Sequence, residues 1–210
     1  MTKLYLLRHG ETTSNYEKRY QGQGDSHLTP LGRKQSERLA EVLKDEPFSA
    51  VYSSDLNRSF ETARMVAKFH KLEVQKVPEL KERNYGVWEG LTFQEIESRY
   101  SEIYKSWLAN PAKTIIPEAE TLEELQKRGI RAVSQIMEKH PNETIAVVAH
   151  GGLNRMILMY YLGMDLNNFW SIKQFNCAVN IIEYGSRPVV LLLNGNWFLK
   201  GLEEEVKGIY

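Results

Sequence analysis

The segment from Leu4 to Asn15 reads LYLLRHGETTSN. Its apolar start, Leu4–Leu7, predicts a short strand that ends on Arg8 and His9. A cation and an imidazole side by side at a strand end suit the binding of an anion, because the planar arginine fork matches phosphate oxygens. We therefore expect this strand to open a fold that presents functional groups where its strands end.

Short apolar strands alternate with amphipathic helices along most of the chain. The predicted strands are Leu4–Leu7, Ala50–Ser53, Glu73–Val77, Thr144–Ala149, Val179–Tyr184 and Val189–Leu193. The predicted helices are Thr29–Lys44, Arg58–His70, a helix opening at Thr121 with Glu124 completing a capping box, and Leu153–Leu162. This alternation predicts an α/β fold, a three-layer α/β/α sandwich with a largely parallel sheet, in which ligands bind beyond the carboxyl ends of the strands.

One segment, residues 85–120, departs from this rhythm. A helical stripe is predicted by apolar residues that recur every three or four positions: Phe93, Ile96, Tyr100, Ile103 and Trp107. The stretch Asn110–Glu120 then reads as a loop. We expect a small helical insertion that packs as core or lid and partly covers a site, within a single domain over residues 1–210.

Composition narrows the class of protein. The 210 residues suffice for one domain with a sizeable core. Lys plus Arg and Asp plus Glu number 27 each, so the zero net charge gives no support for a nucleic-acid or membrane partner. One cysteine, Cys177, excludes an internal disulfide and fits a reducing cytoplasm, where we place the protein. The start predicts no signal peptide, and no run is long enough to span a membrane.

Three predicted strand ends carry polar residues of the same kind. Arg8 and His9 follow the first strand, Arg58 follows the second, and His150 with Gly151 follows the strand TIAVVA. If these strands are parallel neighbours, all three groups face one crevice. Two arginines, two histidines and the glycine-rich start of a helix would form an anion site there.

Four motifs in this order resemble the histidine phosphatase superfamily, which has the phosphoglycerate-mutase-like fold: RHGETxxN at 8–15, SSDLNRSFETA at 53–63, KERNYGVWEG at 81–90 and VVAHGG at 147–152. The resemblance runs over nearly the whole chain. It implies that His9 is the nucleophile that takes the phosphoryl group, that Arg8, Arg58 and His150 bind its oxygens, and that Glu82 is the general acid.

The resemblance also implies contacts with the phosphate or its ester for Asn15, Gln21, Gly22, Tyr85 and Gly151. Arg19 falls at a further matching position. No metal and no cofactor is expected, because cationic side chains can stabilise the transferred phosphoryl group. The partner implied is a small phosphorylated metabolite.

The family contains both mutases and phosphatases. The mutase branch brings a lysine shortly after the YG segment and a pair of adjacent arginines in the insertion, whereas this chain has Phe93 in the first place and no such pair. The segments YGVWEGLTF and LGMDLNNFW resemble the phosphatase branch, which includes α-ribazole phosphatases, broad-specificity phosphatases and metal-independent phosphoserine phosphatases. We therefore expect hydrolysis. The apolar and aromatic insertion, with Phe93, Tyr100, Tyr104 and Trp107, suits a leaving group larger or less charged than glycerate.

Two alternatives stay open: a bisphosphoglycerate-dependent phosphoglycerate mutase, and a non-catalytic phospholigand-binding protein of the same fold. A dinucleotide-binding domain is disfavoured, because no glycine fingerprint follows the first strand. The sequence leaves room for a homodimer. Near the end of the chain, Trp197, Phe198 and Leu199 could serve as core, as a dimer contact or as a cover for the site.

Overall fold

Six strands form one mixed sheet in the computed structural model, which describes residues 1–202. The strands are β1 (Thr2–Arg8), β2 (Phe48–Ser53), β3 (Val74–Lys76), β4 (Thr144–Ala149), β5 (Val179–Tyr184) and β6 (Val189–Gly195). They lie in the order β3-β2-β4-β1-β5-β6. The pairs β1–β4, β2–β4 and β2–β3 are parallel, and β1–β5 and β5–β6 are antiparallel. The largely parallel sheet predicted from the sequence is therefore confirmed.

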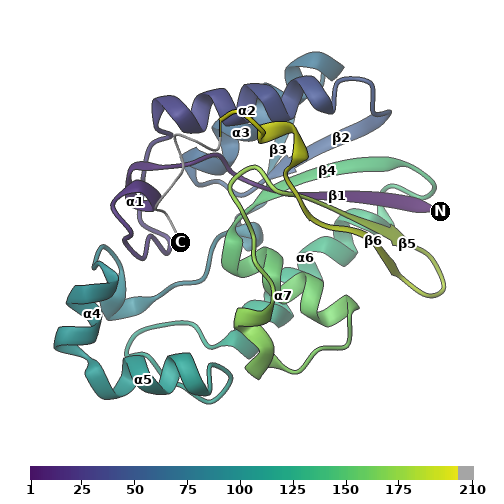
Figure 1. Ribbon diagram of the computed structural model, residues 1–210. Helices are drawn as coiled ribbons and strands as arrows, with labels where there is room; N and C mark the ends of the chain where they lie inside the picture. The colour runs from purple at the N-terminus through teal and green to yellow at the C-terminus, as the bar shows by residue number, and fades with distance from the viewer. Residues whose placement is uncertain (203–210) are drawn as a thin grey trace.

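Helices cover both faces of this sheet. The helices are α1 (Thr13–Tyr16), α2 (Pro30–Val42), α3 (Asn57–His70), α4 (Phe93–Arg99), α5 (Ser101–Ala109), α6 (Leu122–Glu138) and α7 (Gly151–Tyr161). Short 3₁₀ turns are η1 (Pro78–Leu80), η2 (Gly86–Trp88), η3 (Leu166–Ser171) and η4 (Trp197–Leu199). Figure 1 shows α2 and α3 over one face and α6 and α7 over the other, which is the predicted three-layer sandwich.

The strand side chains divide between two cores, as the two-residue period of a strand requires. In β1, Leu4 and Leu6 pack in the cluster that includes α6 and α7, whereas Tyr5 and Leu7 pack in the cluster that includes α2 and α3. Strand β4 is buried on both sides from its second residue to its last. This is expected of a central strand with helices on both faces, and it fixes β4 firmly beside β1.

The helix starts follow the capping signals of the sequence. The side chain of Thr29 accepts a hydrogen bond from the Gly32 N–H at 2.9 Å, and Pro30 occupies the first helical position. Thr121 and Glu124 form the predicted capping box, because each side chain accepts from the other's backbone N–H. Helix α7 begins two residues earlier than predicted, directly after the end of β4.

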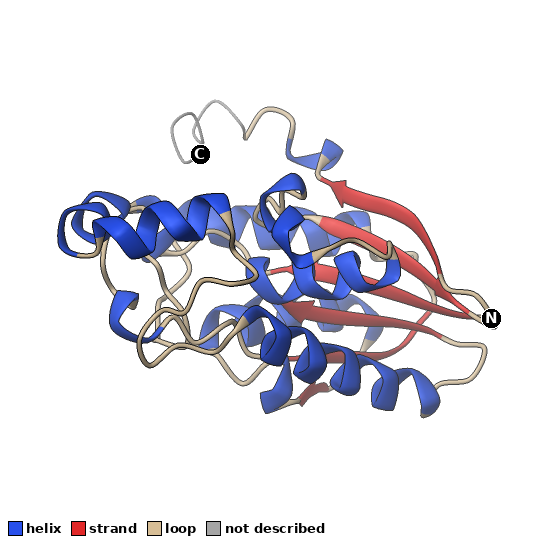
Figure 2. Ribbon diagram, turned by 90° about the horizontal axis from the view of Figure 1, so that it is seen from below, coloured by secondary structure: helices blue, strands red, loops and turns tan. Residues whose placement is uncertain are grey.

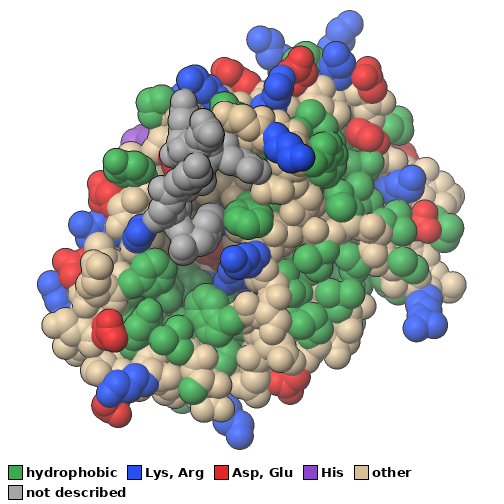
Figure 3. Space-filling model, viewed as in Figure 1, with side chains coloured by type: hydrophobic (Ala, Val, Ile, Leu, Met, Phe, Trp, Pro, Cys, Tyr) green, Lys and Arg blue, Asp and Glu red, His purple; other side chains and the backbone are tan. Residues whose placement is uncertain are grey.

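The predicted stripe in the insertion is two helices rather than one. The chain leaves helical geometry at Tyr100 (φ −132°, ψ 37°), where α4 ends and α5 begins. Ile96 and Trp107 are nevertheless fully buried, so the stripe does pack as core. Figures 1 and 2 show α4 and α5 set apart from the sheet, at the end opposite Met1. Figure 3, which has the orientation of Figure 1, shows hydrophobic side chains gathered on this part of the surface.

Two of the three residues singled out near the end of the chain belong to the core. Phe198 and Leu199 pack in the cluster under α2 and α3, while the Trp197 side chain is half exposed. Within residues 1–202, the structure contains no helix with the length and apolar character needed to cross a bilayer.

Two helix-interior glycines provide a test of this packing. A Cβ on Gly32 would lie 2.0 Å from the carbonyl oxygen of Glu11, which is backbone, whereas a Cβ on Gly129 would meet the flexible end of Leu153 at 2.6 Å. We expect Gly32→Ala to lower the free energy of unfolding by about 1–3 kcal/mol, as overpacking does. Gly129→Ala should cost less, because the gain of about 1 kcal/mol in helix propensity offsets the repacking. Urea unfolding of both variants measures the difference, and an equal or smaller loss in Gly32→Ala would contradict this packing.

Candidate active site

The carboxyl ends of β1 and β4 bring the two histidines together. Arg8 pairs with Ala149 in the parallel register, and the N–H of His9 donates to the carbonyl of Ala149 at 3.2 Å. The residues that follow, His9 and His150, therefore leave the sheet side by side, with ring centroids 5.2 Å apart. Arg58 reaches the same place from the first turn of α3. The predicted meeting of three strand ends in one crevice is confirmed.

His9 is held in one tautomer. Its Nδ1 lies 2.7 Å from the carbonyl oxygen of Gly10, and since a carbonyl can only accept, Nδ1 carries the proton and Nε2 carries the lone pair. The ring is almost fully buried. Burial, followed by the charges of Arg58 and Arg8, holds the pKa of His9 well below its usual value. His9 is therefore a neutral imidazole with a free nitrogen lone pair at neutral pH.

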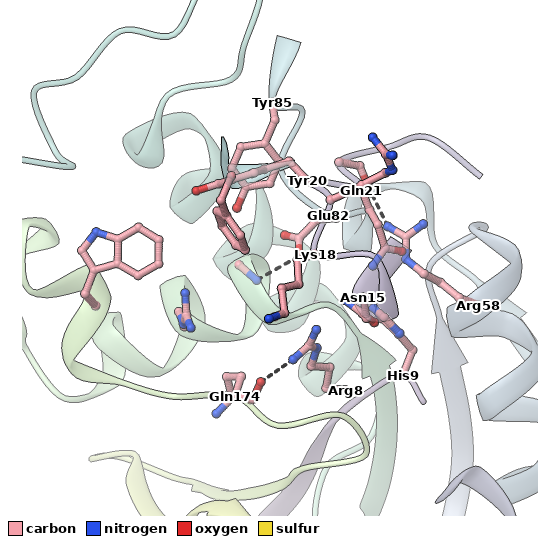
Figure 4. Close-up of a pocket in the computed structure, with 17 residues that line it drawn as sticks. Arg8, His9, Asn15, Lys18, Tyr20, Gln21, Arg58, Glu82, Tyr85 and Gln174 are labelled. Atoms are coloured by element: carbon pink, nitrogen blue, oxygen red, sulfur yellow. Dashed lines mark hydrogen bonds between the residues drawn. The ribbon is translucent and has the colours of Figure 1, made fainter. Parts of the chain in front are cut away.

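Arg8 and Arg58 are two of the cationic residues that line the pocket (Figure 4). Arg58 is buried and donates to the carbonyl oxygens of Gly24 at 2.8 Å and Gly22 at 2.7 Å. Burial lowers its pKa to about 10, so it is still a cation at neutral pH. Arg8 donates to the carbonyl of Gln174. Backbone carbonyls thus orient both guanidinium groups without cancelling their charge.

His150 lies in the buried floor of the site. Its Nε2 is 2.7 Å from the hydroxyl of Ser54, at the end of β2. Burial, with Arg58 as the next cause, holds its pKa well below the usual value. Nδ1 of His150 has no hydrogen-bond partner in the described part of the chain, so a polar atom is free for a ligand beside His9.

Glu82 has an unexpected second role as the cap of helix α7. Its carboxylate accepts hydrogen bonds from the N–H groups of Gly152 at 2.9 Å and Leu153 at 3.1 Å, and from its own neighbour Arg83 at 2.8 Å. The sequence predicts that the N–H groups at this helix start add donors for an anion, and Glu82 occupies some of them. Two of its donors belong to Glu82, which leaves the N–H of Gly151 beside Arg8.

The loop after α1 closes one side of the pocket. Gln21 and Gly22 line it, and Gly22 has φ +55°. A Cβ at Gly22 would lie 1.9 Å from the carboxylate of Glu89, so only glycine fits there. That carboxylate accepts from the N–H groups of Gln23 and Tyr85, each at 3.0 Å. The carboxylate of Glu89 therefore ties this loop to the segment that carries Glu82.

The structure places every predicted site residue in or beside this pocket. Asn15 lines it, and its side-chain oxygen accepts from Thr12 at 3.2 Å and from Asn176 at 3.1 Å. Tyr85 and Gly151 also line it. Arg19 does too, although its guanidinium is engaged by the carbonyl of Gly90 and by two carboxylates.

Several pocket residues were not predicted from the sequence: Lys18, Tyr20, Arg155, Trp170 and Gln174. Arg155 follows Gly151 by four positions in α7 and so shares its face, a spacing that could have indicated it. Its guanidinium lies 4.9 Å from the ring centre of Phe169 and 5.4 Å from that of Trp170. Lys18 and Trp170 lie in irregular or 3₁₀ segments and give no comparable signal.

Metal-ligating side chains do not gather anywhere in residues 1–202: no group of three or more His, Cys, Asp or Glu is placed to hold an ion. The described site offers one imidazole lone pair, one carboxylate, and a set of cationic and N–H donors. That set suits the transfer of a phosphoryl group, in which positioning and charge stabilisation do most of the work.

Comparison with known proteins agrees with this geometry. The sequence model of the histidine phosphatase superfamily (branch 1) matches residues 4–196. The chain belongs to this superfamily. It is 34% identical over 192 residues to phosphoserine phosphatase 1 of Hydrogenobacter thermophilus, covering 91% of each chain. It is 42% identical over 186 residues to the metal-independent phosphoserine phosphatase of Arabidopsis thaliana, covering 87% of this chain and 76% of that one.

A solved structure gives the same result for the fold. The structure of a phosphoserine phosphatase from Entamoeba histolytica in complex with phosphoserine superimposes with a TM-score of 0.86 at 28% identity. The match covers 95% of this chain and 100% of that one. The α4–α5 segment and the pocket described above thus lie within a fold shared with a protein that binds a small phosphate ester.

Because His9 and His150 are buried and neutral, we expect the protein to lose stability as the pH falls. Unfolded histidines bind a proton near pH 6.5, whereas His9 and His150 in the folded protein resist it. The unfolded state therefore binds more protons below about pH 6.5, and the free energy of unfolding should fall there by up to about 1.4 kcal/mol per pH unit for each group. Urea unfolding between pH 5 and 8 measures this slope. His150→Gln should make the slope shallower, and an unchanged slope would show that His150 is not neutral in the folded protein.

Proposed function

We propose that the protein is a metal-independent phosphomonoesterase that hydrolyses a small phosphate ester through a phosphohistidine on His9. The main support is the protonation and hydrogen bonding of His9. His9 is a neutral imidazole whose Nδ1–H is fixed on the carbonyl of Gly10, and two arginine cations flank it. This arrangement leaves Nε2 as a nucleophile beside a site for a phosphate.

The first half of the reaction forms the phosphohistidine. The lone pair of Nε2 attacks phosphorus while the bond to the ester oxygen breaks, and Arg8 and Arg58 stabilise the charge on the phosphoryl oxygens. The free Nδ1 of His150 is a further contact for these oxygens. Glu82 gives its proton to the leaving alkoxide.

The second half releases phosphate. Glu82, now a carboxylate, accepts a proton from water as the water oxygen attacks phosphorus, and the bond to Nε2 breaks. The imidazole returns to its neutral form and inorganic phosphate leaves. One carboxylate serves both steps because the second is the reverse of the first with water in place of the alcohol. The backbone N–H groups of α7 keep Glu82 in place throughout.

The wall of the pocket favours hydrolysis over the mutase alternative. Tyr20, Tyr85, Phe93 and Trp170 make much of that wall. Phe93 stands where a mutase would have a lysine to help retain a bisphosphorylated intermediate. The relatives named phosphoserine phosphatase support the same choice and suggest a small phosphorylated metabolite as substrate. The non-catalytic alternative is disfavoured, because nucleophile, acid and phosphate ligands are all present.

Two further predictions concern the state of the protein in the cell. We propose a cytoplasmic location, because a single buried cysteine, Cys177, fits a reducing compartment. A homodimer fits the edge strand β6, on which alternate side chains are exposed hydrophobics: Val189, Leu191 and Leu193. An edge of this kind pairs readily with a second copy. Light scattering measures the oligomeric state of the wild-type protein and of Leu191→Lys. A wild-type monomer at micromolar concentration would contradict this interface.

We expect His9→Ala to lose phosphate release almost completely, by about 1,000-fold or more, because no other group can take the phosphoryl group. The measurement is phosphate release in excess chelator, without bisphosphoglycerate, from aryl phosphate, phosphoserine, phosphoglycerate and α-ribazole phosphate. The wild-type fold should persist by circular dichroism. Full activity in this variant would exclude the phosphohistidine mechanism, and isomerisation of phosphoglycerate in place of hydrolysis would favour the mutase.

Replacement of Glu82 tests the general acid. Glu82→Gln keeps an acceptor for the α7 N–H groups but cannot donate a proton to an alkoxide. We expect a loss of about 100-fold or more with alkyl phosphates and a much smaller loss with p-nitrophenyl phosphate, whose leaving group needs little protonation. The ratio of the two rates is the readout, and thermal unfolding controls for the cap. Equal losses on both esters would exclude Glu82 as the acid.

A further inference from the structure

Lys18 occupies a backbone conformation that favours glycine. It follows the short helix α1 and has φ +56°, and its N–H donates to the carbonyl of Asn15 at 3.1 Å. A residue with positive φ at the end of a helix is most often glycine, because a Cβ is unfavourable in this conformation. A lysine at this position weakens the local turn. A non-glycine residue held in such a conformation beside a site is a reason to ask what its side chain does.

The side chain of Lys18 points into the pocket. Lys18 lines it together with Arg8, His9 and Glu82, and Figure 4 shows the ammonium group extending toward the centre of the site, on the side of Arg8. Within residues 1–202, no carboxylate lies within 4 Å of the ammonium nitrogen, whereas nearby Arg19 is paired with two. The ammonium group is therefore available to an anionic ligand.

The groups assigned above to the phosphoryl oxygens lie on other segments of the chain than Lys18. The phosphoryl position already has Arg8, Arg58 and His150. Lys18 comes instead from the loop that carries Tyr20, one of the aromatic residues that form the wall on the leaving-group side. An exposed, flexible lysine reaches a substituent of variable position better than a rigid arginine does.

We propose that Lys18 is a specificity-determining residue that binds a carboxylate on the leaving group of the ester. This inference rests on the proposed phosphatase function and refines it. The sequence pointed to a leaving group larger or less charged than glycerate, whereas the structure adds a cation on that side of the pocket. Because the carboxylate takes no part in bond breaking, Lys18 should strengthen ground-state and transition-state binding alike, so its loss should raise KM and leave kcat nearly unchanged.

The test compares two ligands that differ only by the carboxylate. 3-Phosphoglycerate and glycerol 3-phosphate are measured as competitive inhibitors of p-nitrophenyl phosphate hydrolysis. We expect the wild-type protein to bind 3-phosphoglycerate about tenfold more tightly, and Lys18→Gly to reduce this ratio to about one. Inhibition by inorganic phosphate should stay within about twofold, because its ligands are untouched.

Lys71 provides a matched control. It ends helix α3 with φ +55°, in the same left-handed conformation, but it does not line the pocket. Glycine relieves the backbone at both positions, so Lys18→Gly and Lys71→Gly should both unfold at the same or a higher temperature than the wild type. Only Lys18→Gly should lose the preference for 3-phosphoglycerate, and Lys18→Arg should retain most of it.

Two outcomes would overturn the proposal. An unchanged inhibition ratio in Lys18→Gly would show that Lys18 makes no contact with the carboxylate. Equal weakening of both inhibitors and of inorganic phosphate would show that Lys18 binds the phosphoryl group instead. Failure of the proposed function is distinct, because the wild type would then not hydrolyse p-nitrophenyl phosphate. The two binding constants and their ratio can in that case be measured by calorimetry.

Discussion

The parallel pairing of β1 with β4 is the constraint on which the rest of the site depends. The register that sets Arg8 beside Ala149 places the next residue of each strand, His9 and His150, at the same level of the same sheet edge. Neither strand can slip by one residue, because both of its faces are buried and a slip would exchange them. The two histidines are therefore brought together by the hydrophobic pattern of two strands, not by any attraction between the rings.

Placing two arginines beside these histidines, Arg58 buried and Arg8 partly buried, has an energetic consequence. A buried cation without hydrogen bonds would be strongly destabilising, so each guanidinium is held by backbone carbonyls, those of Gly22 and Gly24 for Arg58 and that of Gln174 for Arg8. Carbonyl dipoles offset desolvation but do not neutralise the charge. Burial, and after it the remaining positive potential, keeps the histidines unprotonated, and the same potential attracts a dianion. The same field thus prepares the nucleophile and binds its substrate.

Much of this could be read from the sequence, because it depends on local signals. Strand β4 was predicted with its observed bounds, and both helix caps, at Thr29 and Thr121, are where the threonines indicate. What the sequence could not show depends on tertiary contacts. Nothing in LKER reveals that Glu82 would cap a helix 70 residues away. The φ angle of Lys18 is likewise set by the turn after α1, and a lysine in a polar loop normally indicates only a solvated surface.

The leaving-group wall is built separately from the phosphate site. Its members come from distant segments that hydrogen bonds of Trp107 join. The indole N–H of Trp107 donates to the hydroxyl of Tyr20 at 3.2 Å, and the indole N–H of Trp170 donates to the carbonyl of Trp107 at 3.3 Å. Changes in α4, α5 or η3 can therefore alter the accepted ester without moving the groups at the sheet edge. Such a wall also excludes water. A charge on its border then interacts more strongly with an opposite charge than it would in bulk solvent, so Lys18 can contribute to selectivity alongside the arginines that line the same pocket.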